Sequence, residues 1–431
     1  MKKLIKTLTL LAVLSFSGNL FALSYTDVAS TLADIFQWSV DSNEGDTTFR
    51  SLLIPFGGRT ESLGNAFTGL CDDISFLRYN PAGSCIQTNT QFALFHNSWI
   101  ADSNMETLAY TIRINHLGLS AFASTFYVPF TEYNYFGERV AGNYYSETVG
   151  GLNISYNFLA GYTFKGFALG TTAKVGWRSV PDYADDDTGS IISWSGFKQS
   201  SMAIMVDAGL MLQFNLFKFY ASREPNLKIG IAAQNLGVGI TGAFSNSGLS
   251  IEAVPTYFAV GLSYKVIKPI TITADYKQPV NFINPDGFHW PYLGAGVNIQ
   301  FAHFLSFLAG LELKGANPKI SAGMEFEIAK VRLNMCYSLD LTSSLNPLNK
   351  FSLSMKLVLG DLGRAEKSAE VDRLYSLGLQ AYTEQNWEKA IEIWEECLKI
   401  DKRFDPATTG IVSAQYQIDM FRKIQESLQL D

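Results

Sequence analysis

The sequence predicts an all-β transmembrane barrel of about fourteen antiparallel strands, with an N-terminal plug inside the lumen and a small α-helical domain at the C-terminal end. Three observations support this class. Most of the chain alternates apolar and polar residues with period 2, and no segment after the N-terminus has the roughly 18 consecutive apolar residues of a membrane helix. The 431 residues are 13% aromatic and include 35 glycines, which favours a barrel over several soluble domains.

Residues 1–22 are expected to be a secretory signal peptide. Three lysines precede the apolar run 8–14, which is followed by small residues and a cleavage point after Ala22. The apolar run is too short to span a membrane stably. A lipoprotein signal would need a cysteine at the cleavage point, and the first cysteine is Cys71. The mature protein is therefore expected to reach an outer membrane without that lipid anchor.

The strands are predicted within residues 89–360. In residues 202–214, for example, Ile204 and Val206 alternate with Met205 and Asp207, so that one face suits lipid and the other suits the lumen. A single alternating segment also fits a soluble sandwich, but the joint pattern favours a barrel. The predicted strands are 90–98, 106–115, 117–126, 149–164, 166–178, 201–215, 227–235, 255–265, 269–277, 291–301, 304–313, 318–328, 331–340 and 349–359.

The connections between these strands predict which end of the barrel faces outward. Outer-membrane barrels have short periplasmic turns and longer outer loops. The long connections are 129–146, 181–199, 236–254 and 278–290, and they alternate with tight turns at 115–116, 165, 266–268, 302–303 and 329–330. The long connection 216–226 does not follow this rule.

Residues 23–88 are predicted to form a plug, because the stretch 57–83 suits neither helix nor sheet. Its glycines permit close backbone approach, and Pro81 fixes its own φ while holding Asn80 extended, so that residues 80–83 form a defined turn. Two charges of each sign stand nearby and would neutralise one another if buried: Arg59, Asp72, Asp73 and Arg78. The alternative is an ordinary surface loop.

The stretch resembles the N-terminal plug of the outer-membrane long-chain fatty acid transporter (FadL) family, in a spirochaete-type branch. In that family a glycine-rich segment with an Asp-Asp pair, here Asp72 and Asp73, leads into an Asn-Pro-Ala turn, here Asn80, Pro81 and Ala82. The resemblance implies capture of a hydrophobic ligand by outer loops, entry into a lumen site, rearrangement of the plug and sideways release into the bilayer. It implies a long-chain fatty acid as the ligand and outer-membrane lipid as the surroundings.

One predicted outer loop, 129–145, is rich in aromatic residues. Its side chains include Phe130, Tyr133, Tyr135 and Phe136, and solvent exposure alone would not favour such a density. The resemblance implies that this loop captures ligand. The alternative is an aromatic girdle at the membrane interface.

Residues 361–431 are predicted to form a helical periplasmic domain. Roughly a third of them are charged, and the apolar period changes to 3.6. Residues 371–401 resemble a tetratricopeptide repeat, with departures at Ala381 and Lys402. The residues that carry this resemblance are Leu374, Leu377, Gly378, Tyr382, Trp387, Ala390, Trp394 and Cys397. A lone repeat should pack on the last helix, on the barrel or on a periplasmic protein partner.

The remaining features favour binding over catalysis. The four histidines show no metal-ligand spacing and stand near no nucleophile motif, so neither an enzyme nor a cofactor is expected. The net charge of -7 and the absence of a basic run make nucleic acid an unexpected partner. The acidic run 185–187 is expected to be a solvated loop, with a calcium site as the alternative.

Two questions stay open at this stage. Cys71 and Cys85 flank the turn and either form a disulfide or are two small buried side chains. The main functional prediction is uptake of hydrophobic molecules. Its rival is a non-transporting barrel that anchors or shuttles proteins through the repeat. A general diffusion porin is disfavoured by the plug.

Overall fold

The structure is a computed structural model. It describes residues 45–99, 102–133, 136–162, 164–183, 185, 190–220, 222, 224–242, 248–285, 289–314, 317–341 and 350–428. The predicted signal peptide lies outside these residues. Within the described parts of the chain, no helix is both long and apolar enough to cross a membrane.

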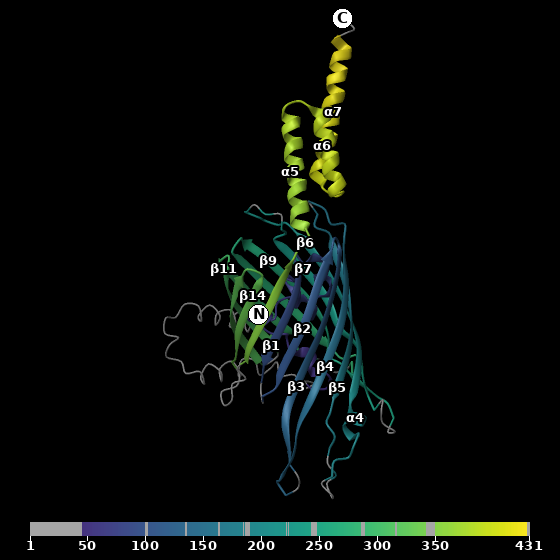
Figure 1. The fold of residues 1–431 in the computed structure, drawn as a ribbon, viewed down its shortest axis with the longest axis vertical. Coiled ribbons are helices and arrows are strands. Elements are labelled where there is room, and N and C mark those ends of the chain that lie inside the picture. The colour runs from purple at the N-terminus through teal and green to yellow at the C-terminus, as the bar shows by residue number, and fades with distance from the viewer. Residues whose placement is uncertain are drawn as a thin grey trace, which may run out of the picture.

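A closed antiparallel β-barrel forms the body of the molecule (Figure 1). Consecutive strands pair as neighbours, β1 also pairs with β15, and β6 pairs with β7. The four-residue β8 pairs only with β7, so fourteen strands form the ring. The ring strands are β1 (Thr90–Ser98), β2 (Asn104–Ile114), β3 (Leu117–Tyr133), β4 (Arg139–Phe158), β5 (Phe167–Ser179), β6 (Ser201–Phe214), β7 (Leu227–Thr241), β9 (Thr256–Ile267), β10 (Ile270–Val280), β11 (Tyr292–Ala302), β12 (Leu305–Lys314), β13 (Asn317–Ile328), β14 (Val331–Asp340) and β15 (Lys350–Gly360).

The predicted barrel is confirmed strand for strand, with corrections at both ends. The predicted loop 129–146 is mostly strand, because the β3–β4 ladder continues through Pro129↔Tyr144 and ends at Tyr133↔Arg139. β8 (Ser250–Ala253) lies in another predicted loop. At the other end β4 ends at Phe158, so the connection to β5 is 159–166 and not a turn at Lys165 alone.

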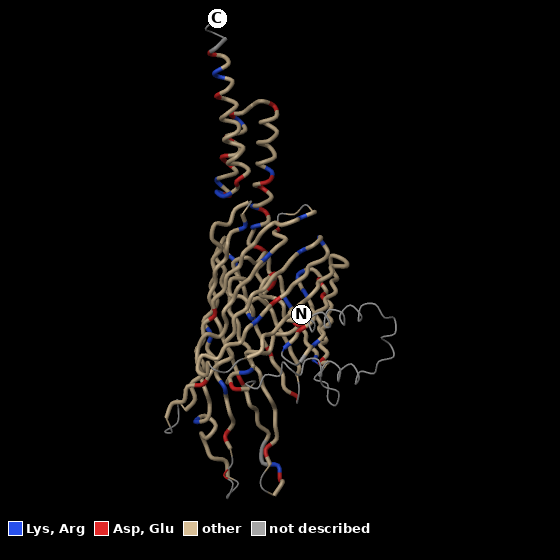
Figure 2. Tube along the Cα trace, turned by 180° about the vertical axis from the view of Figure 1, so that it is seen from behind, with Lys and Arg blue, Asp and Glu red and all other residues tan. Residues whose placement is uncertain are grey.

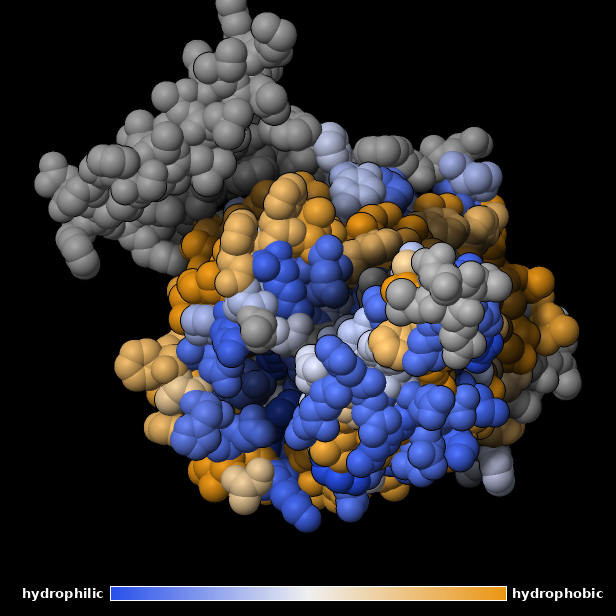
Figure 3. Space-filling model, turned by 90° about the horizontal axis from the view of Figure 1, so that it is seen from above, coloured by the Kyte–Doolittle hydropathy of each residue, from blue (hydrophilic) through white to orange (hydrophobic). Residues whose placement is uncertain are grey.

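The strands have an apolar face on the outer surface of the barrel and a buried face toward its filled lumen. On β6, Ile204 and Val206 are exposed outward while Met205 and Asp207 are buried inside, as the alternation predicted. The same pattern recurs around the ring, and apolar residues cover the sides of the molecule in Figure 3. A surface of this kind suits contact with lipid.

Residues 45–89 fill the lumen as a plug of short helical turns joined by irregular segments. These turns are η3 (Arg50–Leu53), α3 (Arg59–Ser62), η4 (Ile74–Arg78) and η5 (Pro81–Ile86). Phe56, Leu63, Phe67, Ile74 and Phe76 lie in a core shared by plug and wall. Burial of so many aromatic and aliphatic side chains holds the plug inside the ring.

Three helices extend from one end of the barrel (Figures 1 and 2): α5 (Arg364–Thr383), α6 (Trp387–Ile400) and α7 (Asp405–Leu428). The short connections, such as 115–116 and 329–330, lie at this end, which we call the helical end. The opposite end carries the long β3–β4 hairpin and is called the hairpin end.

The helical domain contacts the barrel directly. The Arg364 guanidinium donates hydrogen bonds to the carbonyl oxygens of Thr88 and Arg113. The rings of Tyr162 and Phe404 meet edge to face, with centroids 5.0 Å apart. The connection 159–166 therefore contacts the helical domain just before α7.

Candidate functional site

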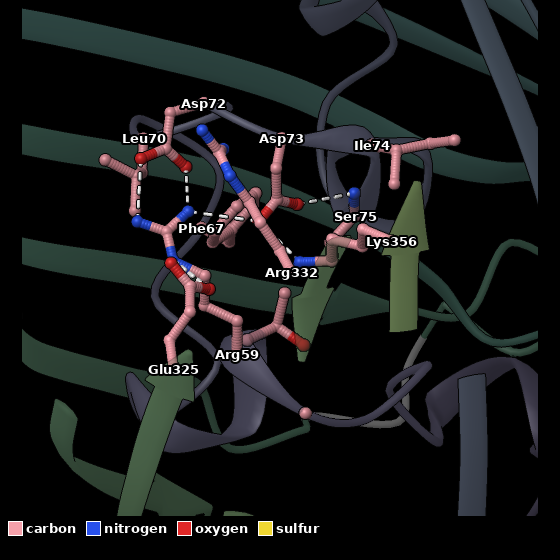
Figure 4. Close-up of polar contacts among 12 residues, drawn as sticks. Arg59, Phe67, Leu70, Asp72, Asp73, Ile74, Ser75, Glu325, Arg332 and Lys356 are labelled. Atoms are coloured by element: carbon pink, nitrogen blue, oxygen red, sulfur yellow. Dashed lines mark hydrogen bonds and ion pairs between the residues drawn. The ribbon is translucent and has the colours of Figure 1, made fainter. Parts of the chain in front are cut away.

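Arg59, at the start of α3, is the centre of a charged cluster inside the plug (Figure 4). Its guanidinium forms a bidentate pair with Asp72, with Nη2 2.8 Å from Oδ2, and Nη1 also donates to Asp73 at 3.0 Å. Glu325 of β13 lies 3.4 Å from Nε. The predicted pairing of Arg59 with the Asp-Asp pair is present, and the wall supplies a third carboxylate.

Asp73 joins this cluster to a second strand of the wall, β15. Its carboxylate accepts from Nζ of Lys356 on β15 at 2.6 Å and from the backbone N–H of Ser75 at 2.8 Å. Burial disfavours the carboxylate, but Lys356 and Arg59 outweigh burial and hold the pKa of Asp73 well below its ordinary value. Asp73 therefore remains ionised and ties the plug to β15.

Arg78 does not join the cluster, although its charge was expected to take part. It is buried, its Nη2 donates to the Ser51 carbonyl at 3.3 Å, and its guanidinium lies 5.9 Å from the Phe56 ring centroid. The prediction that Arg59 and Arg78 together neutralise Asp72 and Asp73 is therefore wrong for Arg78. The second cation on the Asp-Asp pair is Lys356, which is distant in sequence and could not be assigned from local spacing.

The Asn-Pro-Ala turn is a fixed part of the plug. Asn80 is extended, with φ -151° and ψ 110°, and its Oδ1 accepts from the Ala82 N–H at 3.1 Å. Its Nδ2 donates to the carbonyls of Thr68 and Leu210, each at 3.1 Å. Pro81 begins η5 without losing a needed N–H. Asn80 thus joins two parts of the plug to β6.

Cys71 and Cys85 are buried free thiols in the structure. Their sulfurs lie near different backbone carbonyls, Phe67 at 3.4 Å for Cys71 and Ala82 at 3.4 Å for Cys85. In the structure the two cysteines are therefore small buried side chains that pack within the plug. They do not form the disulfide that was the alternative.

Wall residues that the sequence did not single out hold the plug backbone. Asp275 of β10 accepts from the N–H groups of Phe67 and Thr68 at 2.9 and 2.8 Å. The ammonium of Lys277 donates to the Asn65 carbonyl at 2.8 Å, and that of Lys228 donates to the Leu70 carbonyl at 3.1 Å. The only local signal was the presence of ionisable residues on the lumen face of the strands, Lys228 on β7 and both Asp275 and Lys277 on β10.

Glycines of the wall permit contact between strand and plug backbones. A Cβ at Gly296 would lie 2.6 Å from the Leu63 carbonyl oxygen, and one at Gly230 would lie 2.6 Å from the Thr68 carbonyl carbon. Such distances do not occur for real Cβ atoms. Similar close approaches to the plug backbone recur at Gly118, Gly170, Gly261, Gly294 and Gly310, and Gly209 and Gly323 lie as close to the plug side chains of Asn80 and Ser62.

A cavity of about 410 Å³ opens on the hairpin-end side of the plug, and we call it the hairpin-end cavity. Aromatic and apolar side chains line one part: Phe49, Leu53, Ile54, Trp99, Phe126 and Tyr145. Charged side chains line the rest: Arg50, Glu61, Glu147, Arg178, Glu312, Lys314, Lys319 and Lys350. The cavity therefore combines apolar surface with five cationic and three anionic side chains.

A second cavity of about 230 Å³ lies on the helical-end side, and we call it the helical-end cavity. Arg59 and Asp72 of the plug line it, together with strand residues and turns of β9 to β14. Its charged wall residues are Lys265, Lys268, Glu325, Glu327 and Arg332. Figure 3, viewed onto this end, shows hydrophilic residues around a hollow.

The predicted capture residues lie at the end of the long hairpin. Phe130 and Tyr133 are exposed on β3, and Phe136, in the turn after it, is 83% exposed. Tyr135 lies outside the described residues. The aromatic side chains extend beyond the cavity at the hairpin end and form no enclosed site among the described residues.

The predicted repeat residues are mostly buried in the helical domain. Gly378, Ala390 and Trp394 pack together, and the Trp394 Nε1 donates to the Tyr375 carbonyl at 3.3 Å. Leu377 is an exception, because it is 40% exposed. The buried face of α5 includes Leu374 and Gly378, and Leu377 lies one helical position away from that face.

Within the described residues, no three His, Cys, Asp or Glu side chains are grouped so as to hold a metal ion. Asp185 is described, whereas Asp186 and Asp187 are outside the described part of the chain. The expectation of a solvated acidic loop stays a prediction.

The ring, its apolar outer surface and the filled lumen define a plugged β-barrel of the outer-membrane type. The chain belongs to the family described as "Uncharacterised protein family (UPF0164)", whose pattern matches residues 24–362. A UPF0164 protein of Treponema pallidum (strain Nichols) is 28% identical over 412 residues, covering 94% of this chain and 90% of that protein. A second one from that strain is 29% identical over 392 residues, covering 88% and 77%.

Solved structures with similar architecture are also barrels. The toluene transporter TbuX of Ralstonia pickettii has a TM-score of 0.44 at 12% identity and covers 70% of this chain and 98% of its own. The CymD monoaromatic hydrocarbon channel has a TM-score of 0.46 at 13% identity, with coverage of 70% and 97%.

Proposed function

We propose that this protein takes up hydrophobic molecules with an anionic headgroup, in particular long-chain fatty acids, across an outer membrane. Residues 23–88 act as the plug, residues 89–360 as the barrel, and residues 361–431 as a periplasmic helical domain related to a tetratricopeptide repeat. The protein is not an enzyme and needs no cofactor in this proposal.

The observation that carries this function is the hairpin-end cavity. Its aromatic side chains, including Trp99 and Phe126, offer apolar surface for a hydrocarbon chain. Its lysines offer charge to a carboxylate. Lys350 is paired with Glu61 of the plug, so a bound anion would compete with a plug carboxylate. A neutral hydrocarbon would form no ion pair with any of these lysines.

The proposed orientation places the hairpin end outside the cell. Long hairpins at one end and mostly short turns at the other, apart from the connections 159–166 and 215–226, follow the usual layout of outer-membrane barrels. An exposed aromatic hairpin, with Tyr133 and Phe136, would then meet ligand first. The helical domain would lie in the periplasm.

A labelled long-chain fatty acid offered to a host without its own transporter tests the proposal. Wild-type protein should support uptake, and Trp99→Ala combined with Lys319→Gln should lower it because both the chain and the headgroup lose contacts. Leu152→Ala, on the lipid-facing side of β4, is the matched control and should leave uptake unchanged. Deleting residues 80–82 should also lower uptake while leaving small-solute leakage small, whereas deleting 57–83 should open a polar channel. Absence of uptake by the wild-type protein contradicts the proposal.

A second candidate is a barrel that anchors or shuttles periplasmic proteins through its helical domain. It is favoured by one observation: Val412, Tyr416 and Met420 follow one another at four-residue spacing on α7 and are all exposed. Repeat domains usually cover such a face with the next helix. Specific retrieval of periplasmic proteins that is lost in Tyr416→Glu, without fatty acid uptake, would favour this candidate.

A further inference from the structure

The two cavities approach each other on opposite sides of one short plug element, α3. Glu61 and Asn65 line the hairpin-end cavity, whereas Arg59 lines the helical-end cavity. α3 (Arg59–Ser62) carries a side chain of each lining, Arg59 at its first position and Glu61 two residues later. α3 therefore forms the partition between a cavity open at the hairpin end and one at the helical end.

The ends of α3 are built for a change in backbone angle. Gly57 and Gly58 precede it with φ of 104° and 66°, and Gly64 and Asn65 follow it with φ of 61° and 58°. Glycine adopts positive φ without strain, so Gly57, Gly58 and Gly64 can absorb a rotation, whereas Asn65 is held by hydrogen bonds to Glu312 and Tyr79. The turn that follows η4 has no glycine immediately before it and is held by the three hydrogen bonds of Asn80.

Two separate sets of polar contacts hold α3 in place, and each includes a partner on the wall. On the hairpin-end side, the Glu61 carboxylate accepts from Lys350 and Ser352 of β15. On the helical-end side, Arg59 is paired with Asp72, Asp73 and Glu325 as described above. The two sets share no side chain, so one can open before the other.

The chemistry of the first set points to what opens it. Lys350 is bonded to a carboxylate and lies in the lining of the hairpin-end cavity, 10% exposed. A carboxylate that enters this cavity offers Lys350 the same charge and hydrogen-bond acceptors as Glu61. Glu61 would then be left without its cation in a site where an unpaired buried charge is unfavourable.

We propose that α3 is the moving partition of the transport path, and that an anionic headgroup opens it by replacing Glu61 on Lys350. The ligand then passes beside β12 to β15 into the helical-end cavity, where Arg59, Lys268 and Arg332 meet the headgroup. This inference rests on the proposed function. It places release at the helical end instead of sideways through the barrel wall.

Conductance of the full-length protein in planar bilayers tests the inference, with laurate and its neutral counterpart dodecanol as probes. Wild-type conductance should be low and should rise about tenfold with laurate but not with dodecanol, a change that corresponds to about 1.4 kcal/mol. Glu61→Gln should be about tenfold more conductive without ligand and should respond little to laurate, because the first set of ion pairs is already broken.

Lys228→Gln is the matched control, since Lys228 also binds the plug from the wall but at Leu70, outside α3. It should behave as the wild type. Heat-modifiable gel migration checks that each barrel has assembled. If Glu61→Gln does not assemble, Arg59→Gln takes its place; it breaks the second set of contacts and should also raise conductance. Equal responses to laurate and dodecanol, or equal conductance of Glu61→Gln and Lys228→Gln, overturn the inference. Labelled fatty acid uptake distinguishes failure of the α3 path from failure of the proposed function. Uptake by the wild type, with unaltered conductance in the α3 variants, overturns the α3 path alone. No uptake by the wild type overturns the proposed function.

Discussion

Gly230→Ala should detach part of the plug from the barrel. The added Cβ would lie 2.6 Å from the Thr68 carbonyl carbon and 2.9 Å from Nδ2 of Asn80. β7 is held by β6 on one side and β9 on the other, so the plug must move and not the strand. Overpacking of this kind costs about 1 to 3 kcal/mol. Loss of the Asn80 hydrogen bond to Thr68 adds about 1 kcal/mol.

A total of about 2 to 4 kcal/mol shifts the equilibrium between docked and undocked plug by roughly 30-fold to 900-fold. Hydrogen exchange of residues 57–83 should accelerate accordingly, and small-antibiotic sensitivity of cells should increase. The barrel should keep its heat-modifiable migration, because Gly230 lies on the lumen face.

Gly150→Ala on β4 is the matched control for this prediction. The nearest atom to its added Cβ is the Phe122 carbonyl oxygen at 3.9 Å, an ordinary contact. Plug exchange should be unchanged in this variant. Equal exchange rates of the plug in Gly230→Ala and the wild type would refute the reasoning from close backbone approach.

Three further predictions concern topology, the helical domain and the plug charges. An epitope inserted in 190–199 should be labelled on intact cells and one after Leu428 should not; the reverse pattern would invert the topology. Ala390→Trp should make residues 361–431 protease-sensitive while the barrel still assembles, since overpacking costs about 1 to 3 kcal/mol in a domain with its own core; loss of both parts together would show one cooperative unit. Asp73→Asn should accelerate plug exchange at neutral pH, because it leaves Lys356 buried without its carboxylate, at a cost of about 3 to 5 kcal/mol. The folded pKa of Asp73 is lowered, so the stabilisation that its carboxylate gives is present above the unfolded pKa of about 3.9 and is lost as pH falls through the lower folded pKa. Hydrogen exchange of the wild-type plug should therefore rise only in strong acid. Asp73→Asn should lack that rise.

The order of strands could be obtained from the sequence because it depends on local periodicity. Alternation such as that of Ile204 and Asp207 decides which face meets lipid, and antiparallel strands joined by short connections pair with their chain neighbours. The turn at Asn80 and Pro81 was likewise local, since φ restrictions and an Asx hydrogen bond act over two residues.

Which wall residue pairs with which plug residue was decided only by the tertiary structure. Asp73 and Lys356 are 283 residues apart, and their pairing depends on barrel closure and on the depth of the plug. The same holds for Glu61 with Lys350 and for the glycines that meet the plug backbone. A sequence shows that a strand carries a lysine or a glycine on its lumen face. Which plug atom it meets follows from strand tilt and from the path of an irregular segment, because no repeating hydrogen-bond pattern fixes that path.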